Sequence, residues 1–280
     1  MNIRGLLLDV EGVLVTDKSY APVPGAVEFI GHMRAAGCPF RLISNNTTDD
    51  RGGMLTKLAR AGFDFAEREL HTCTSAAVNR LLALGARRCL VLGNVTLRRI
   101  FLEAGFAVVD DADVDAVVVG LDTDLTFQRL QMATEAILRR QAAFIALHHN
   151  RIYDDAAGRP APSVGALAAA LEYATRSEAT VIGKPSPQYF QQALADLQAC
   201  ADGNLTPAQV LVVSDDPLSD LAGARRLEMR AAFVLSGKYA DRAVLERVPA
   251  EERPDMTVGR IGDLLGNPQL SFTRAAPRGQ

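Results

Sequence analysis

Short apolar runs alternate with amphipathic stretches along nearly the whole chain, and turn-forming residues separate them. Apolar runs of about four to eight residues predict buried strands, whereas apolar residues spaced three and four positions apart predict helices. Their alternation is typical of parallel βαβ units, so we expect an α/β fold with a doubly wound parallel sheet. The expected strands cover residues 3–10, 40–45, 88–93, 116–121, 144–149, 180–183, 209–215 and 231–235, and the expected helices cover 25–36, 49–61, 75–84, 96–104, 126–140, 164–175, 187–199 and 218–227.

The composition narrows the class of protein without identifying its chemistry. With 30 Lys and Arg against 33 Asp and Glu, the formal net charge is −3, and 48% of the residues are hydrophobic. These values exclude a disordered chain and a broadly basic nucleic-acid-binding protein. The longest apolar runs fall far short of the ~20 residues of a membrane-spanning helix, and the first residues lack the apolar stretch of a secretory signal. We therefore expect a cytoplasmic protein that binds neither nucleic acid nor membranes.

Polar residues follow four of the expected strands at the point where each strand ends. In a doubly wound sheet, ligands bind beyond the carboxyl ends of the strands, so these positions are the first candidates for a site. Carboxylates, a hydroxyl and an ammonium group would meet at one edge of the sheet, which suits a phosphate together with a metal ion. In chain order these residues are Asp9 with Glu11, Ser44 with Asn45, Lys184, and Asp215 with Asp216.

Asp9 and Glu11 stand two residues apart and are followed by Gly12. In extended backbone they point to the same side, with Cα atoms roughly 6.5 to 7 Å apart, and the glycine lets the chain turn beyond them. At this spacing one carboxylate can attack a phosphorus atom while the second transfers the proton of the leaving group or of the attacking water. The pair therefore suggests catalytic residues for phosphoryl chemistry.

The other candidates would neutralise the charge of a phosphoryl group. Asp215 and Asp216 offer the hard oxygen ligands that Mg²⁺ prefers. Ser44 and Lys184 would bind further phosphoryl oxygens. Each piece alone has an ordinary explanation: a D-x-E pair is usually solvated, a serine at a strand end usually caps a turn, and Asp215-Asp216 before Pro217 can cap a helix. Their ordered occurrence at strand ends favours a site.

The chain resembles the haloacid dehalogenase superfamily of phosphatases, which use an aspartate nucleophile. More narrowly, it is similar to the NagD-type branch with a large α/β cap, and within that branch to the phospholysine phosphohistidine inorganic pyrophosphate phosphatase group. The resemblance extends over about residues 3 to 265. Its four motifs lie at residues 7–14, 43–46, 183–187 and 212–224, and further similar segments lie at 151–153, 170–174, 179–185 and 236–239.

The resemblance implies a role for each carboxylate at the site. Asp9 would be the nucleophile that becomes an aspartyl-phosphate, and Glu11 occupies the position of the general acid and base. Asp9, the backbone carbonyl of Glu11 and Asp215 would hold the Mg²⁺ cofactor, with Asp216 close by. The implied activity is that of a Mg²⁺-dependent phosphatase acting on a small phosphorylated metabolite.

The resemblance also implies which residues would bind the phosphoryl group. Ser44 and Lys184 would contact its oxygens, and Asn45 would line the site. Asp220 would position Lys184, because an ammonium group near a metal needs a fixed anion to stay oriented.

Two residues depart from the family pattern. The family usually carries aspartate at the position of Glu11, and the added methylene moves the carboxylate by about an ångström, which can cost roughly 10²-fold in rate. Ser214 stands where the family has glycine, so a side chain enters a tight turn beside Asp215. These departures leave open a catalytically weakened protein that binds a phosphorylated ligand or a protein partner as a regulator. A phosphotransferase using the same intermediate stays open as well.

The spacing of the motifs predicts two nested domains. Lys184 stands 140 positions after Ser44, which leaves room for one βα crossover of about 30 residues and roughly a hundred residues of further α/β structure. We expect a discontinuous core domain at residues 1–76 and 181–280, with an α/β cap domain inserted at 77–180.

The inserted cap is expected to determine the substrate. The resemblance implies that it covers the site, where such lids exclude water. The segment 147–153 follows an expected cap strand, and we expect it to be a loop whose His149 and Arg151 face the substrate; a solvated or structural role for Arg151 is the alternative. The resemblance also leaves a homodimer open.

Overall fold

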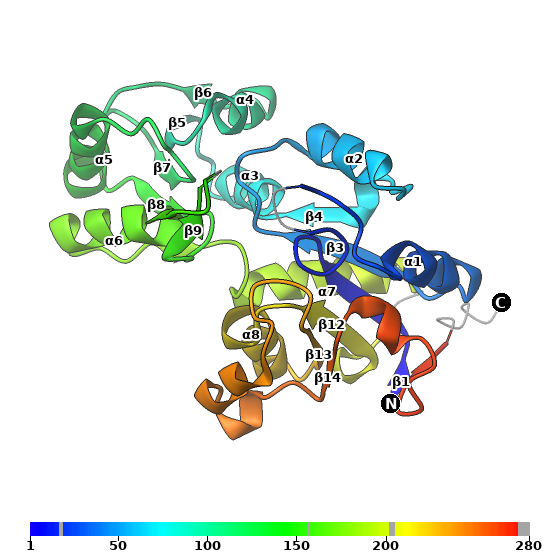
Figure 1. The fold of residues 1–280 in the computed structure, drawn as a ribbon. Helices are drawn as coiled ribbons and strands as arrows, with labels where there is room; N and C mark the ends of the chain where they lie inside the picture. The colour runs from blue at the N-terminus through cyan, green and yellow to red at the C-terminus, as the bar shows by residue number, and fades with distance from the viewer. Residues whose placement is uncertain (17–18, 156, 202–204, 274–280) are drawn as a thin grey trace. The chain divides into compact units, whose positions relative to one another are not determined.

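The chain folds into two compact units, each built from segments that are separated in the sequence (Figure 1). The computed structural model describes residues 1–16, 19–155, 157–201 and 205–273. The first unit comprises residues 1–44, 54–71 and 184–280, and the second comprises 45–53 and 72–183. The motif spacing predicts the borders of the inserted part at 76/77 and 180/181, whereas residues 45–53, 72–76 and 181–183 also belong to the second unit.

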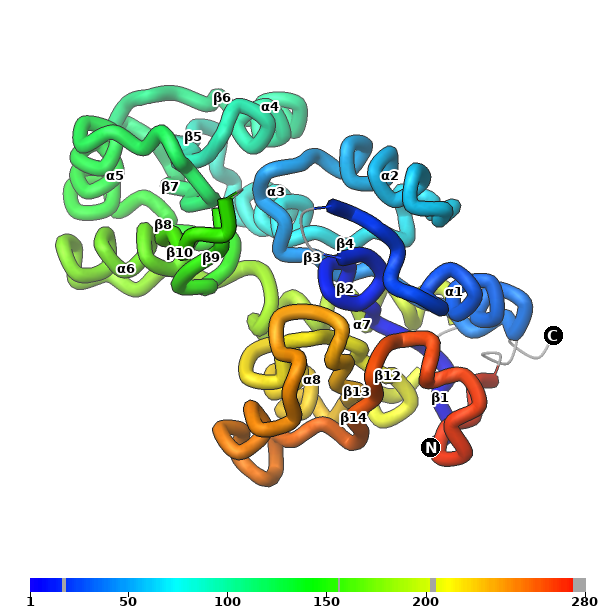
Figure 2. The backbone as a smooth tube through the Cα atoms, in the orientation of Figure 1, coloured from blue at the N-terminus to red at the C-terminus, as the bar shows by residue number. Residues whose placement is uncertain are grey.

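A six-stranded sheet forms the centre of the first unit, with the order β14-β13-β12-β2-β3-β4. The pairs from β14 through to β3 are parallel, which confirms the expected α/β class. Every position of β2, β3 and β12 is buried, as in parallel strands covered on both faces. Strands from the two ends of the chain lie side by side in this sheet (Figure 2). The strands are β2 (Gly5–Asp9), β3 (Phe40–Ser44), β4 (Leu70–Thr72), β12 (Val210–Ser214), β13 (Arg230–Val234) and β14 (Met256–Val258), and a separate parallel pair joins β1 (Asn2–Ile3) to β15 (Ser271–Phe272).

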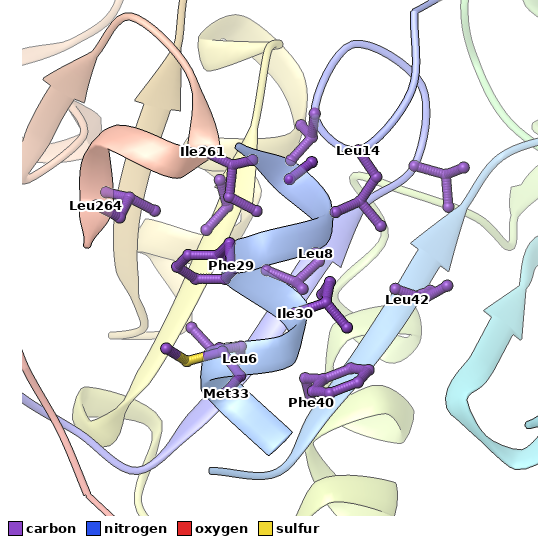
Figure 3. Packing of buried hydrophobic residues seen from close by; sticks show 14 of the residues in the cluster. Leu6, Leu8, Leu14, Phe29, Ile30, Met33, Phe40, Leu42, Ile261 and Leu264 are labelled. Carbon is purple, nitrogen blue, oxygen red and sulfur yellow. The ribbon is translucent and has the colours of Figure 1, made fainter. Parts of the chain in front are cut away.

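Helix α1 (Ala26–Ala35) shows how apolar spacing determines the packing of the first unit. Its residues 26, 29, 30 and 33 recur at helical spacing, and all four are buried. Phe29 and Met33 pack with Leu6 and Leu8 of β2 in the main apolar cluster (Figure 3). The other helices here are α2 (Arg51–Arg60), of which residues 51–53 belong to the second unit, α7 (Pro187–Cys200), α8 (Ala222–Arg226), the 3₁₀ helices Glu67–Glu69, Pro207–Gln209, Arg242–Arg247, Ala250–Glu252 and Ile261–Leu264, and a π-helical turn at Pro217–Leu221.

A five-stranded parallel sheet forms the second unit, with the order β11-β8-β7-β5-β6. Apolar residues of helices α5 and α6 pack on this sheet in a second cluster. An antiparallel hairpin precedes α6. The strands are β5 (Arg88–Leu92), β6 (Ala107–Val108), β7 (Ala116–Val119), β8 (Ala143–Ala146) and β11 (Thr180–Val181), the hairpin is β9 (Ile152–Asp154) with β10 (Pro160–Pro162), and the helices are α3 (Cys73–Ala83), α4 (Val95–Glu103), α5 (Phe127–Arg140) and α6 (Val164–Thr175).

The structure corrects some expected elements. The expected helix 218–227 is a π-helical turn followed by the short α8, and its start is fixed by Asp216, whose carboxylate accepts hydrogen bonds from the Leu218 and Ser219 amides. The expected loop 147–153 runs into strand β9, so its last residues belong to a hairpin. Several short strands, such as β4, β6 and β14, were not expected because runs of two or three residues show no periodicity, whereas the two-residue β11 lies within the expected strand 180–183. No helix in the described ranges has the length and apolarity to cross a membrane.

Candidate active site

The candidate site lies where the order of strands changes direction in the first sheet. Strand β2 lies between β12 and β3, and its Asp9 pairs with Ile43, one residue before Ser44. On the other side Leu8 pairs with Val213, so Ser214 ends β12 next to Asp9. In open α/β sheets the crevice at such a switch point is where ligands bind.

Both oxygens of the Asp9 carboxylate are held by neighbouring groups. Oδ1 lies 2.6 Å from Nζ of Lys184 and accepts a hydrogen bond of 2.8 Å from the Val10 amide. Oδ2 lies 3.2 Å from the Ser214 hydroxyl, which can donate to it. Asp9 is only 7% exposed, so its orientation is fixed while an edge stays open to solvent.

Lys184 forms the positive centre of the site. Its ammonium lies 2.6 Å from Asp9 Oδ1 and 2.7 Å from Asp220 Oδ2, and Lys184 is 3% exposed. Burial disfavours the ammonium, but the carboxylates of Asp220 and Asp9 outweigh this effect and raise the pKa of Lys184 well above its usual range. The predicted contact between Asp220 and Lys184 is thus present.

The carboxyl groups around Lys184 are difficult to ionise together. Burial raises the pKa of Asp9 and of Asp215 to about 6, from an ordinary value of 3.8, and Lys184 only partly offsets this for Asp9. Burial likewise raises the pKa of Asp220 to about 7. When ionised, these groups carry more negative charge than Lys184 neutralises, so a bound cation would stabilise them.

Asp215 occupies a space that only glycines leave open. A Cβ atom on Gly12 or on Gly237 would overlap Oδ2 of Asp215, and Gly12 has a φ of +79°, which side chains rarely adopt. The same oxygen accepts a 2.6 Å hydrogen bond from the Lys238 amide. Gly12 therefore serves the packing of Asp215 as well as the turn after Glu11.

Asp216 acts as a helix cap, which is the structural alternative that the sequence left open. One of its oxygens accepts hydrogen bonds from the Leu218 and Ser219 amides, and the other lies 2.6 Å from the Lys238 ammonium. Asp216 therefore lies beside Asp215 with both carboxylate oxygens in contact with donors.

Glu11 and Ser44 are each contacted by a tyrosine hydroxyl. The Tyr20 hydroxyl donates to Oε1 of Glu11 over 3.1 Å. Ser44 is fully buried, and its amide donates to the Tyr189 hydroxyl over 3.1 Å. The Tyr189 hydroxyl in turn lies 2.7 Å from the His71 carbonyl oxygen, to which it can donate. The Tyr189 hydroxyl thus links the end of β3 to β4 and α7.

Three of the predicted site residues belong to the second unit. Oδ1 of Asn45 lies against Gly183, where a Cβ atom would overlap it. His149 and Arg151 line a cavity of about 560 Å³ formed with the β9–β10 hairpin and the start of α6. The predicted carboxylates, Ser44 and Lys184 thus lie together in the first unit. Asn45, His149 and Arg151 belong to the second unit.

The donors at the site suit Mg²⁺ in kind. No cluster of three or more Asp, Glu, His or Cys side chains has metal-binding geometry within the described residues. Mg²⁺ needs fewer protein ligands than such a cluster provides, since it is usually bound by one or two carboxylates, with waters and substrate oxygens completing its coordination shell. The Asp9 and Asp215 carboxylates, whose pKa values burial raises, match that requirement in chemistry and in charge.

The sequence left several contacts of the site unidentified. Ser214 was identified only as a departure from glycine, whereas its hydroxyl lies within 2.9 Å of Asp220 and 3.2 Å of Asp9. Lys238 and Gly237 lie in segment 236–239, whose sequence resembles the family without indicating a contact with Asp215. Tyr20 carries no motif, because contacts between loop side chains leave no periodic pattern.

Comparison with known proteins identifies the family. A sequence model described as haloacid dehalogenase-like hydrolase matches residues 6–107, and a second HAD-hydrolase-like model matches residues 181–264. The chain is 32% identical to haloacid dehalogenase-like hydrolase domain-containing protein 2 of Rattus norvegicus over 240 residues, 85% of this chain and 86% of the relative. It is 30% identical to phospholysine phosphohistidine inorganic pyrophosphate phosphatase of Xenopus laevis over 268 residues, 94% of this chain and 92% of the relative.

A solved structure agrees with these relatives. The p-nitrophenyl phosphatase from Archaeoglobus fulgidus superimposes with a TM-score of 0.83 at 27% identity, covering 95% of this chain and 99% of that one. The chain belongs to the haloacid dehalogenase-like hydrolases. Within them it is an enzyme of the phosphatase class, as the resemblance of its motifs implied.

Proposed function

We propose that the protein is a Mg²⁺-dependent phosphatase that removes phosphate from small phosphorylated metabolites through an aspartyl-phosphate on Asp9. One observation carries the proposal: a buried carboxylate ends the central strand at the switch point, in direct contact with the ammonium of Lys184. A carboxylate held in this way can act as a nucleophile towards phosphorus once the charge of the phosphoryl group is neutralised.

The chemistry takes two steps. An Asp9 oxygen attacks phosphorus, the bond from phosphorus to the leaving oxygen breaks, and Glu11 gives that oxygen its proton. Water then attacks the phosphorus of the aspartyl-phosphate, Glu11 takes the proton of the water, and phosphate leaves with Asp9 restored. Each residue therefore finishes the cycle as it began.

Two residues bind the phosphoryl oxygens in this proposal. Lys184 supplies a permanent charge, because Asp220 and Asp9 keep the pKa of its ammonium high. Ser44 supplies its hydroxyl as a hydrogen-bond donor at the end of β3, the strand next to β2, which ends at Asp9. Both are at least 97% buried, so their contacts to phosphate would be made with little competition from water.

The metal site would be made by Asp9, Asp215 and the backbone carbonyl of Glu11. When bound, Mg²⁺ supplies the positive charge that allows two anions, the carboxylate and the phosphoryl group, to approach. Asp216 would not bind the metal ion directly, because its carboxylate caps the π-helical turn and pairs with Lys238.

The names of similar proteins suggest a substrate class. The names of the similar proteins include phosphatases of p-nitrophenyl phosphate and of phospholysine, phosphohistidine and pyrophosphate. We expect small phosphoesters or phosphoramidates, selected by the second unit through His149, Arg151 and the side chain of Asn45. A homodimer stays a prediction.

The first experiment is a hydrolysis assay with purified protein. We expect phosphate release from p-nitrophenyl phosphate with Mg²⁺, loss of release with EDTA, and loss on Asp9→Asn. A panel of sugar phosphates, nucleotides, glycerol phosphates, pyrophosphate and phospho-amino acids would then identify the substrate. Absence of release across the panel would refute the proposal.

A second candidate function follows from Ser214. Its hydroxyl lies 3.2 Å from Oδ2 of Asp9 and can donate to it, and such a bond stabilises the carboxylate before attack. This contact favours a slow enzyme that retains its ligand and acts as a regulator. Tight Mg²⁺-dependent binding of a phosphorylated compound, with no turnover, would support this function over the first.

A further inference from the structure

We propose that Tyr20 is a positioning residue for proton transfer by Glu11. The proposal rests on the proposed function and deepens it by assigning the group that orients the acid and base. The observation behind it is the hydrogen bond of 3.1 Å from the Tyr20 hydroxyl to Oε1 of Glu11.

The backbone of Tyr20 lies in a conformation that its side chain disfavours. Its φ is +54°, in the left-handed region where glycine is favoured and a bulky residue is an outlier. Such a conformation is strained and persists only where surrounding contacts hold it. The segment around it supplies those contacts: Val15 bridges Pro22, and the Thr16 amide donates to the Ala21 carbonyl over 2.8 Å.

Two contacts hold the ring of Tyr20. It packs against the apolar cluster of the first unit that contains Leu6 and Phe29. The ammonium of Lys57 lies 5.1 Å from the centre of the ring, within the range of a cation–π contact. With the ring fixed by packing, its hydroxyl points from a rigid support towards Glu11.

Glu11 and Tyr20 are the two ends of one short connection. Glu11 forms an isolated β-bridge with Val15, and Val15 forms another with Pro22. These backbone contacts bring Tyr20 back towards Glu11. The extra methylene of glutamate adds one rotatable bond compared with aspartate. The Tyr20 hydroxyl restricts that freedom, and this is the physical role that we assign to it.

The leaving group separates this role from a structural one. The ratio kcat/KM reports the steps up to the first irreversible one, here the formation of the aspartyl-phosphate. An alkoxide needs the proton from Glu11 to leave, whereas p-nitrophenolate leaves readily without it. A displaced Glu11 therefore slows glycerol 3-phosphate more than p-nitrophenyl phosphate, while a damaged fold slows both equally.

The test is a double-mutant cycle of Tyr20→Phe and Glu11→Gln with both substrates. We expect Tyr20→Phe to lower kcat/KM for glycerol 3-phosphate about tenfold, and for p-nitrophenyl phosphate less than about threefold. In the Glu11→Gln background, Tyr20→Phe should change either value less than about twofold, because the group that it positions is gone. Tyr173→Phe, an exposed tyrosine on α6, is the matched control and should change neither substrate.

Four distinguishable outcomes overturn the proposal. An equal loss for both substrates means that Tyr20 is structural. The same loss in the wild-type and Glu11→Gln backgrounds means that Tyr20 acts through another group. If Glu11→Gln itself leaves both substrates unchanged, or if the wild type releases no phosphate at all, the proposed function fails and the inference fails with it.

Discussion

Replacing Lys184 by methionine tests the electrostatics of the site, because it keeps an unbranched side chain of nearly the same size and removes its charge. In the structure the ammonium contacts Asp9 at 2.6 Å and Asp220 at 2.7 Å and is almost fully buried. The variant leaves these two carboxyl groups buried together without a cation. Removing one partner of a buried ion pair typically costs about 3–5 kcal/mol, and we expect a loss in that range at pH 8.

The cost of Lys184→Met should depend on pH. With Lys184 present, burial raises the pKa of Asp9 to about 6 and that of Asp220 to about 7, so in the wild type both groups are mostly neutral at pH 5 and mostly charged at pH 8. In the variant the loss of Lys184 raises both pKa values further. Without Lys184, only the charged forms are strongly unfavourable. The loss of stability should therefore shrink to less than about half between pH 8 and pH 5.

Urea unfolding followed by circular dichroism, in buffer with EDTA, measures this cost. Lys238→Met is a matched control, since its ammonium is half exposed and pairs with Asp216 at the surface of the site. Such a pair contributes about 0–1 kcal/mol. The reasoning is refuted if Lys184→Met costs no more than Lys238→Met, or if its cost is the same at both pH values.

Three further changes test neighbouring parts of the site. Without metal, the free energy of unfolding of the wild type relative to Asp220→Asn should fall as the pH rises from 4 to 8. Folding raises the pKa of the Asp220 carboxyl from 3.8 to about 7, so its contribution to stability is fully present below pH 3.8 and is lost as the pH rises through 7. Urea titrations at three pH values measure this difference, and a rise with pH would contradict the prediction. Ser214→Ala should raise kcat about 2- to 10-fold by removing a donor to Asp9, and a fall would show that the hydroxyl assists catalysis. Gly12→Ala should lower kcat about 10²-fold or more by displacing Asp215, whereas Gly85→Ala, with a similar φ of +72° and no atom within 4 Å of the added Cβ, should leave kcat unchanged; equal losses would contradict the packing argument.

The sequence predicted those parts of the fold that repeat a pattern. The run ending at Asp9 is apolar at 6, 7 and 8 because β2 is buried on both faces, and such runs can be recognised without coordinates. The hairpin of β9 and β10 was missed, since its strands have three residues each and the second contains two prolines. The π-helical turn after Asp216 could not be told from an α-helix, because the apolar spacing of the two over five residues is too similar.

The candidate site was predictable where polar residues end strands, and not where contacts join distant loops. Asp9, Ser44 and Ser214 end neighbouring parallel strands of one sheet, whereas Lys184 follows β11 of the other sheet and still contacts Asp9. The contacts of Ser214 and Tyr20 could not be predicted, because they depend on side-chain directions that a sequence does not specify. The cap role of Asp216 was one of two alternatives, and only coordinates showed that both its oxygens contact donors.

The central claim is that Asp9 becomes phosphorylated during turnover. The protein is quenched while it hydrolyses p-nitrophenyl phosphate with Mg²⁺ and is then treated with borohydride. Borohydride reduces an aspartyl-phosphate to homoserine, which peptide mass spectrometry can locate. We predict homoserine at position 9, present only with substrate and absent from Asp9→Asn, which should also release no phosphate. Steady turnover with Asp9 unmodified, together with continued phosphate release by Asp9→Asn, would contradict the account.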